Sequence, residues 1–143
     1  MITDVLRSRR AQQQQWAEAK RVVYVRFLMA LAQAHSRMTM AAARLEDGPS
    51  RTQAIHDAFL SDPHNSDAKS VLRELAIAAP DHIYEAAVPI YHQLRKARDM
   101  LASDGVTFET PEYQAVIQPF FAELDSLQRL MRNDLQPPAS RRV

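Results

Sequence analysis

The sequence has 143 residues, of which 46% are hydrophobic and 24% charged, as expected for one globular domain with an apolar core. Two glycines and no cysteine exclude Gly-rich phosphate loops, disulfide frameworks, thiolate metal sites and cysteine nucleophiles. The 18 basic and 17 acidic residues nearly cancel, so the chain as a whole is not strongly attracted to nucleic acid or anionic lipid.

The first predicted helix runs from about residue 3 to residue 45, a segment without Gly or Pro. Its mostly apolar positions recur at spacings of three and four in two neighbouring rows, which make a stripe wide enough to contact several helices of a bundle. The first row is Trp16, Lys20, Val23, Phe27, Ala30, Ala34, Met38, Ala41 and Leu45, and the second is Tyr24, Leu28, Leu31, His35 and Ala42.

The second predicted helical region follows Ser50, a plausible N-cap, and places Ile55 and Phe59 four residues apart. Residues 62–65 interrupt it, and it resumes after a further N-cap at Ser66. Pro80 marks its end and suits the first position of the next helix. The face of the resumed segment consists of Ala68, Leu72, Leu75 and Ala79.

The third predicted helix covers residues 81–102, and its seam steps alternately by four and three, as in a coiled coil. The fourth covers residues 110–136, with Thr110 as N-cap and Pro111 at the first helical position. The seam of the third is Ile83, Ala87, Ile90, Leu94, Ala97 and Leu101, and the face of the fourth is Tyr113, Val116, Phe120, Leu124, Leu127 and Met131, widened by Ile117 and Leu130.

These elements predict an all-α fold, a four-helix up-down bundle with an elongated first helix. We expect a polar and basic extension at residues 1–15, the bundle at 16–136 and a flexible basic tail at 137–143. Pro89 and Pro119 fall inside predicted helices and each should bend its helix. The bends would either wrap the two helices around the first or open a small cavity.

The first helix is longer than its partners. If continuous it spans about 65 Å, roughly twice the length of the helix at 81–102. Part of it must therefore project, fray or pair with another chain. We favour pairing with a second copy, as a homodimer, through the apolar side chains of its first turns. The candidates for self-association are Ile2, Val5, Leu6 and Trp16.

The charges are unevenly distributed along the chain. Residues 1–44 carry a net charge of +6 and the remainder −5. The simplest interpretation is that the basic first helix docks on the acidic remainder. The alternative is that Arg7, Arg9 and Arg10 contact nucleic acid or an anionic surface, which we consider possible but do not favour.

Histidines and tyrosines supply the other candidates for chemistry. His35 lies on the apolar face of the first helix and is interpreted as a core histidine. Asp57, Asp62, His64 and Asp67 surround the interruption of the second helical region, where a solvated acidic turn is the simpler interpretation than a cation site.

His82 and Glu85 lie three residues apart in the reverse order of the Glu-x-x-His pairs of helical metal sites. With Tyr91 they form a second alternative, a ligand- or metal-binding bundle. No nucleophile elbow or carboxylate pair accompanies them. We therefore expect a protein that is not an enzyme and has no cofactor and no metal.

The most apolar window, residues 22–34, contains Arg26 and is shorter than the roughly 20 residues that a membrane span needs. Asp4 and the glutamines at 12–15 occupy the place of a signal peptide's apolar stretch. The sequence thus predicts a cytoplasmic protein without a membrane span.

Three segments, residues 16–28, 75–80 and 131–135, resemble a loosely defined group of small all-helical actinobacterial proteins of unknown function. That resemblance implies a helical fold and neither a reaction nor catalytic residues. Together these patterns predict a non-enzymatic interaction or scaffold module that self-associates and has a protein partner.

Overall fold

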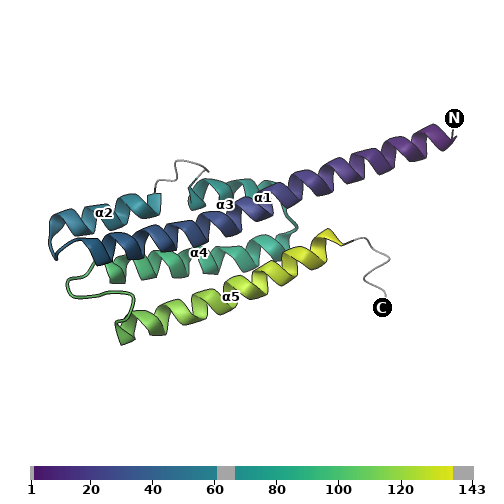
Figure 1. Cartoon of the computed structure of the whole chain (residues 1–143). Helices are drawn as coiled ribbons and strands as arrows, with labels where there is room; N and C mark the ends of the chain where they lie inside the picture. The colour runs from purple at the N-terminus through teal and green to yellow at the C-terminus, as the bar shows by residue number, and fades with distance from the viewer. Residues whose placement is uncertain (1, 61–66, 137–143) are drawn as a thin grey trace.

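A computed structural model describes residues 2–60 and 67–136, and these residues form helices and connecting turns without a strand (Figure 1). The helices are α1 (Ile2–Arg44), α2 (Pro49–Leu60), α3 (Ala68–Ala78), α4 (Asp81–Leu101) and α5 (Pro111–Leu135). The predicted all-α class is confirmed.

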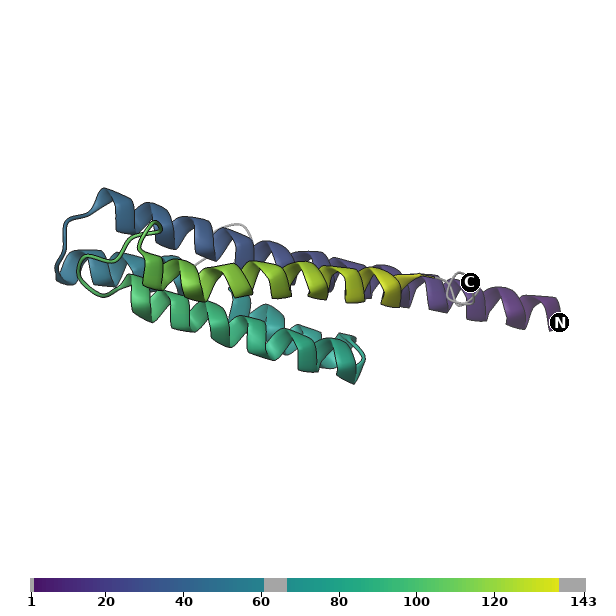
Figure 2. The same cartoon turned by 90° about the horizontal axis from the view of Figure 1, so that it is seen from below.

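Helix α1 is the spine of the molecule, since it contacts each of the other four helices. Helices α2 and α3 follow one another along α1, and α4 and α5 pack against each other beside it (Figures 1 and 2). The free end of α1 extends beyond every other helix in both views.

The predicted helix boundaries need small corrections. Helix α2 begins at Pro49, so Ser50 lies inside it instead of capping it. Ser66 is outside the described residues, and the N-cap of α3 is Asp67, whose carboxylate accepts a hydrogen bond of 3.0 Å from the backbone N–H of Ser70. Pro80 occupies the N-cap position of α4, one residue before the helix. Thr110 and Pro111 take their predicted places at the start of α5.

The core lies where the seams of the helices meet. All six predicted seam residues of α4 are buried, as are Ile55 and Phe59 of α2. In α5, Leu124 is half-buried and Leu130 is exposed, whereas the other predicted face residues are buried. In α3 the buried face is Ala68, Val71 and Leu75, and Leu72 is only half-buried.

The buried stripe of α1 is shorter at both ends than the sequence predicts. Trp16 is 60% exposed and Leu45 42% exposed, and the first fully packed residue of the stripe is Tyr24. Trp16 lies at the end of an exposed stretch of α1, residues 3–16, and Leu45 follows the last residue of that helix, Arg44. Both side chains therefore lack a packing surface.

Residues 2–16 of α1 form a projecting arm, of which residues 3–16 are all exposed. At about 1.5 Å per residue the arm is roughly 22 Å long. Of the three expectations for the long first helix, the structure shows projection, with the helix continuous to Ile2.

Candidate functional site

The arm carries most of the residues predicted for self-association. Val5, Leu6 and Trp16 are 54%, 50% and 60% exposed, and the side chain of Ile2 lies outside the described residues. Val5 and Trp16 are separated by about three helical turns and so lie on the same side of the arm. The structure thus displays two apolar positions at opposite ends of one arm face.

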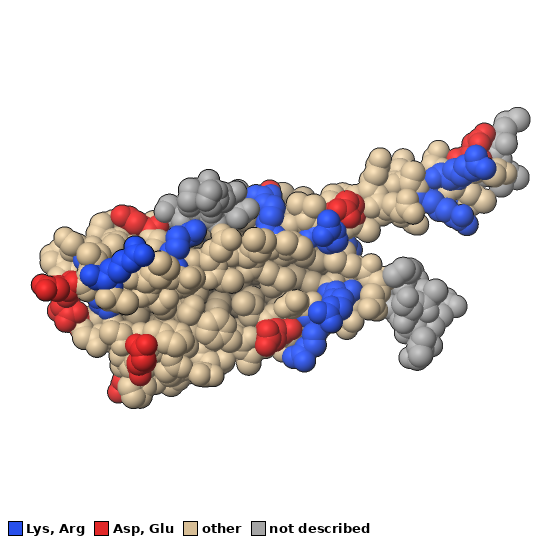
Figure 3. Space-filling view, viewed as in Figure 1, with Lys and Arg blue, Asp and Glu red and all other residues tan. Residues whose placement is uncertain are grey.

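The three candidate anion contacts lie between these positions. Arg7, Arg9 and Arg10 are exposed, and Figure 3 shows their basic side chains gathered near the end of the arm, with one acidic side chain beside them. None of the three has an ion-pair partner among the residues that the structure describes.

Closer to the bundle, basic residues of α1 do pair with the rest of the chain. Lys20 Nζ lies 2.8 Å from the carboxylate of Asp134 in α5, and Arg26 Nη1 lies 3.0 Å from that of Glu74 in α3. These two ion pairs neutralise part of the positive charge of α1 within the molecule. The arginines of the arm take no part in them.

The pairing at Asp134 belongs to a small polar cluster that joins α1 to the end of α5. The Tyr24 hydroxyl donates a hydrogen bond of 2.6 Å to the same carboxylate oxygen that Lys20 approaches. Burial of Tyr24, followed by this hydrogen bond and the charge of Asp134, raises the pKa of its phenol well above its usual value. The hydroxyl thus remains a donor.

The residues predicted for ligand or metal binding are not brought together as a metal centre. His82 and Glu85 are exposed near the start of α4, whereas Tyr91 is buried two turns later. Within the described ranges no three His, Asp or Glu side chains gather as metal ligands would.

The acidic turn was also considered as a cation site. Asp62 and His64 lie outside the described residues. Asp57 accepts a hydrogen bond of 2.8 Å from Gln53, and Asp67 caps α3. The two described carboxylates thus each serve a local helical role.

His35 is buried among aromatic rings, in agreement with its interpretation as a core histidine. Its ring centroid lies 5.0 Å from that of Phe121 and 6.3 Å from that of Tyr113, which stacks on it. Burial lowers the pKa of His35 from 6.5 to about 4. Among the described residues, neither His35 Nε2 nor the Tyr113 hydroxyl has a hydrogen-bond partner, so both buried polar atoms lack one there.

Arg51 is a buried residue that sequence reasoning missed. Its side chain is 2% exposed, and its guanidinium donates to the carbonyl oxygens of Ala42, Ser103 and Val106. It thereby links the end of α1 to the segment after α4. An arginine that binds main-chain oxygens leaves no signal in the sequence, because every residue offers a carbonyl.

Pro89 adjoins a small cavity between two helices. This cavity of ≈ 250 Å³ lies between α4 and α5, where Pro89, Ile90 and Leu127 contribute to its wall. Pro119 does not line it. A small cavity was one of the two expected results of the predicted bends. Of the two prolines, only Pro89 lies at this cavity.

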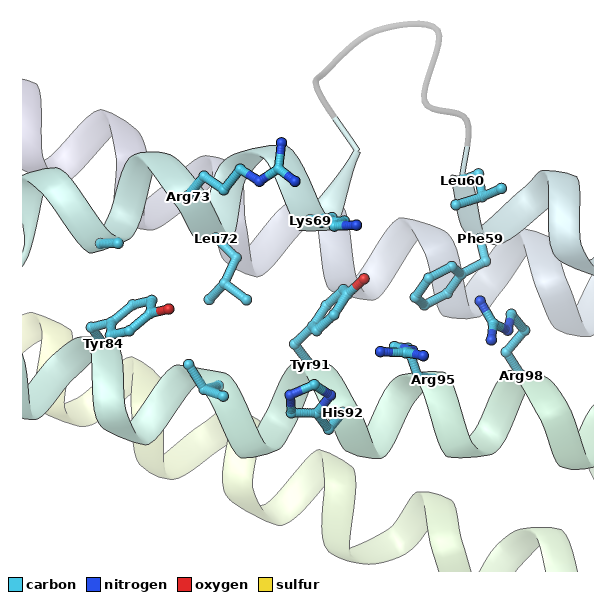
Figure 4. Close-up of a pocket in the computed structure, with 12 residues that line it drawn as sticks. Phe59, Leu60, Lys69, Leu72, Arg73, Tyr84, Tyr91, His92, Arg95 and Arg98 are labelled. Carbon is cyan, nitrogen blue, oxygen red and sulfur yellow. The ribbon is translucent and has the colours of Figure 1, made fainter.

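A larger cavity, which we call the basic pocket, lies between α4 and the helices α2 and α3 (Figure 4). It has a volume of ≈ 560 Å³. Its cations are Lys69, Arg73, Arg95 and Arg98, and the remaining residues that line it are Phe59, Leu60, Leu72, Ala76, Tyr84, Val88, Tyr91 and His92. From the sequence, Tyr91 was a binding candidate in a different grouping, and Phe59 and Leu72 were expected on apolar faces. The four cations were not predicted to line one pocket, because residues from three helices meet here.

No family model, curated protein or solved structure matches this chain. Among the helices of the described residues, none has a stretch long and apolar enough to cross a membrane.

Proposed function

We propose that the chain is a non-enzymatic interaction module that self-associates through its arm. Counting α2 and α3 as one interrupted leg, we further propose that the helices form a four-helix up-down bundle that supports the arm. The observation that carries the proposal is a projecting helix on which Val5, Leu6 and Trp16 are each half or more exposed. Apolar side chains that gather on one exposed side mark contact sites, and Val5 and Trp16 share one side of the arm.

An antiparallel pair of arms best uses these side chains. If the two-fold axis passes near residues 10 and 11, Val5 of one copy lies beside Trp16 of the other, and the contact occurs twice. Two arms of about 22 Å bury less than the roughly 1,200 Å² typical of stable complexes. We therefore expect a weak dimer.

The positive charge of the arm affects the stability of this dimer. Arg9 lies on the same side of the arm as Val5 and Trp16, so its two copies approach each other near the axis, and like charges there repel. Salt screens that repulsion, so the dimer should become tighter as the ionic strength rises.

Trp16 provides a direct test, because it is the single tryptophan of the chain and lies on the arm. Sedimentation equilibrium from about 5 to 500 µM protein should show a monomer–dimer equilibrium, and tryptophan emission should shift to the blue over the same range. The double variant Val5→Ser/Leu6→Ser should remain monomeric. Val22→Ser, which changes an exposed valine of α1 outside the arm, is the matched control and should dimerise normally.

A strict monomer at all concentrations, with unchanged emission, would contradict the proposal. Equal dimerisation of the arm variant and the wild type would contradict the role of the arm.

The second candidate is an anionic partner, nucleic acid or a lipid surface, bound through Arg7, Arg9 and Arg10. Their exposure without an ion-pair partner in the described ranges favours it. Binding to duplex DNA or to vesicles containing phosphatidylglycerol should then weaken steeply with salt, which is the opposite trend to that of the dimer. Unchanged binding after replacement of the three arginines by glutamine would exclude this candidate.

A further inference from the structure

The basic pocket presents cations from two facing helices over an apolar floor. Lys69 and Arg73 belong to α3, and Arg95 and Arg98 to α4, while the ring of Tyr91 stands between the helices (Figure 4). The ring centroids of Tyr91 and Phe59 lie 5.8 Å apart, so the two rings form a continuous aromatic surface. The pocket therefore combines positive charge with apolar contact area.

The positive charge of the pocket is only partly neutralised. Arg98 pairs with Asp99 at 2.8 Å, and its guanidinium carbon lies 4.7 Å from the centre of the Phe59 ring. By contrast, the side chains of Lys69, Arg73 and Arg95 make no hydrogen bond or ion pair within the described part of the chain. No Asp or Glu is among the residues that line the pocket.

Two acidic residues at the start of α3 and within it are already engaged. The two carboxylate oxygens of Asp67 accept hydrogen bonds of 3.0 Å from the backbone N–H and the hydroxyl of Ser70. Glu74, on the same helix as Arg73, pairs with Arg26 of α1. Within the described residues, neither carboxylate pairs with Lys69, Arg73 or Arg95.

The phenol of Tyr91 adds a neutral donor at the centre of the pocket. Burial raises its pKa, and the opposing influence of the Arg95, Arg98 and Arg73 charges does not cancel that effect. The hydroxyl thus stays protonated at neutral pH and can donate a hydrogen bond to an anion.

We propose that the basic pocket binds a small organic phosphate, with the phosphate held by Lys69, Arg73 and Arg95. The apolar part of the ligand lies against Phe59, Leu72 and Tyr91. A phosphate dianion suits three unpaired cations better than a single carboxylate does, and arginine binds phosphate oxygens in a bidentate manner. The volume of the pocket lies within the range of small-molecule sites. The proposal does not depend on the arm.

A solvated basic surface is the simplest competing explanation, and it makes a different prediction. On such a surface inorganic phosphate would bind as well as any ester, and no apolar group would add affinity. In the basic pocket, an ester with an aromatic or alkyl body gains contact with the ring surface that inorganic phosphate lacks.

Calorimetric titration of the full chain provides the test, with adenosine monophosphate and octyl phosphate as the two esters and inorganic phosphate and adenosine as partial ligands. We expect at least one ester to bind with a Kd below about 1 mM and each partial ligand to bind at least about tenfold more weakly. The ester that binds identifies the apolar body as a flat ring or an alkyl chain.

The variant Arg73→Gln/Arg95→Gln should weaken ester binding by roughly 30-fold or more, because it removes two charge-assisted contacts. Lys96→Gln is the matched control, since Lys96 is exposed next to Arg95 and does not line the pocket; its Kd should stay within about twofold of the wild type. Both substituted arginines are exposed, so the variant should fold, and circular dichroism checks this. Without ligand it should melt no lower than the wild type, because like-charge repulsion is relieved.

Three results would overturn the proposal. The first is that neither ester binds, and the second is that the double variant and the wild type bind equally well. The third is that inorganic phosphate, or a hexaglutamate peptide used as an acidic polypeptide, binds as tightly as the better ester.

Discussion

His35 shows how one buried side chain links the aromatic packing to pH. Its imidazole contacts aromatic rings on several sides, and its Nε2 atom has no hydrogen-bond partner within the described part of the chain, so the fold accommodates the neutral form. The unfolded chain takes up a proton near pH 6.5, whereas the folded chain does so only near pH 4. This stabilising difference is complete above pH 6.5 and is lost as the pH falls toward 4.

We therefore expect the free energy of unfolding to fall by about 3 kcal/mol through His35 between pH 6.5 and pH 4. Urea unfolding at a series of pH values measures this slope. His35→Leu should flatten it, because leucine has no proton to bind, whereas His82→Gln, at an exposed histidine of α4, serves as the control. An equal slope in His35→Leu and the wild type would assign the acid sensitivity to other groups.

Arg51 is a second buried polar residue, and its guanidinium contributes to the stability of the fold. One guanidinium provides hydrogen bonds to three main-chain carbonyls, one at the end of α1 and two in the segment after α4. Without it, these acceptors would be buried with fewer partners, and each such loss costs about 1–3 kcal/mol.

Arg51→Met should lower the free energy of unfolding by about 3 kcal/mol or more, as measured by urea denaturation. Arg51→Lys should also destabilise the fold, because an ammonium group cannot span the same three oxygens. Arg44→Gln, at an exposed arginine of the last turn of α1, should change stability by less than about 0.5 kcal/mol. Arg51→Met with the stability of the wild type would show that water replaces the guanidinium.

At the scale of elements, the clearest sequence signals predicted helices well. The seam of α4 was found in full because its apolar residues alternate without a break, and all six are buried. The N-caps were less predictable, because Ser66 and Asp67 are both good capping residues and neighbours in sequence. The basic pocket was not predictable, since Lys69 and Arg95 read as surface residues of separate helices until packing places those helices face to face.

Helix α5 is joined to α1 by a polar contact, which the spacing of apolar residues in the sequence does not reveal. Tyr24 and Lys20 meet one carboxylate of Asp134, which is close to the end of α5. Because Asp134 lies in the last turn of α5, this cluster fixes the last turns of α5 beside the base of the arm. A separate ion pair joins α1 to α3.

Tyr24→Phe should destabilise the protein by about 1.5–3 kcal/mol, because it removes a hydrogen bond to a charged, largely buried acceptor. Amide exchange should accelerate most in the last two turns of α5. Tyr84→Phe makes the same chemical change at a half-buried tyrosine without a hydrogen-bond partner in the described residues, and it should have little effect. Uniform acceleration along all helices would argue against a local role.

At the scale of the whole molecule, the arm and the bundle differ in what stabilises them. The arm has only its own backbone hydrogen bonds, and an isolated helix of about 15 residues is marginal in water. The bundle adds the packing of 25 buried hydrophobic side chains among the described residues. The two parts should therefore respond differently to solvent.

Amides of residues 6–16 should exchange within seconds at neutral pH, while those at the centre of α4 are protected by the global free energy of unfolding. Exchange measured by mass spectrometry at low and high protein concentration checks this. Under the proposed self-association, protection of the arm should rise with concentration while that of α4 stays constant. Slow exchange of the arm in the dilute monomer would contradict this account of its stability.

The position of α1 as the spine has a consequence for the synthesis of the chain. Ribosomes make α1 before any of the helices that cover it, so Phe27, Leu31 and Met38 leave the exit tunnel without a packing partner. Helices α2 and α3 cover part of this surface, and α5 arrives only when most of the chain has been translated. Nascent chains that stop before α4 therefore keep an apolar strip exposed, and such intermediates are the ones that chaperones bind and that aggregate.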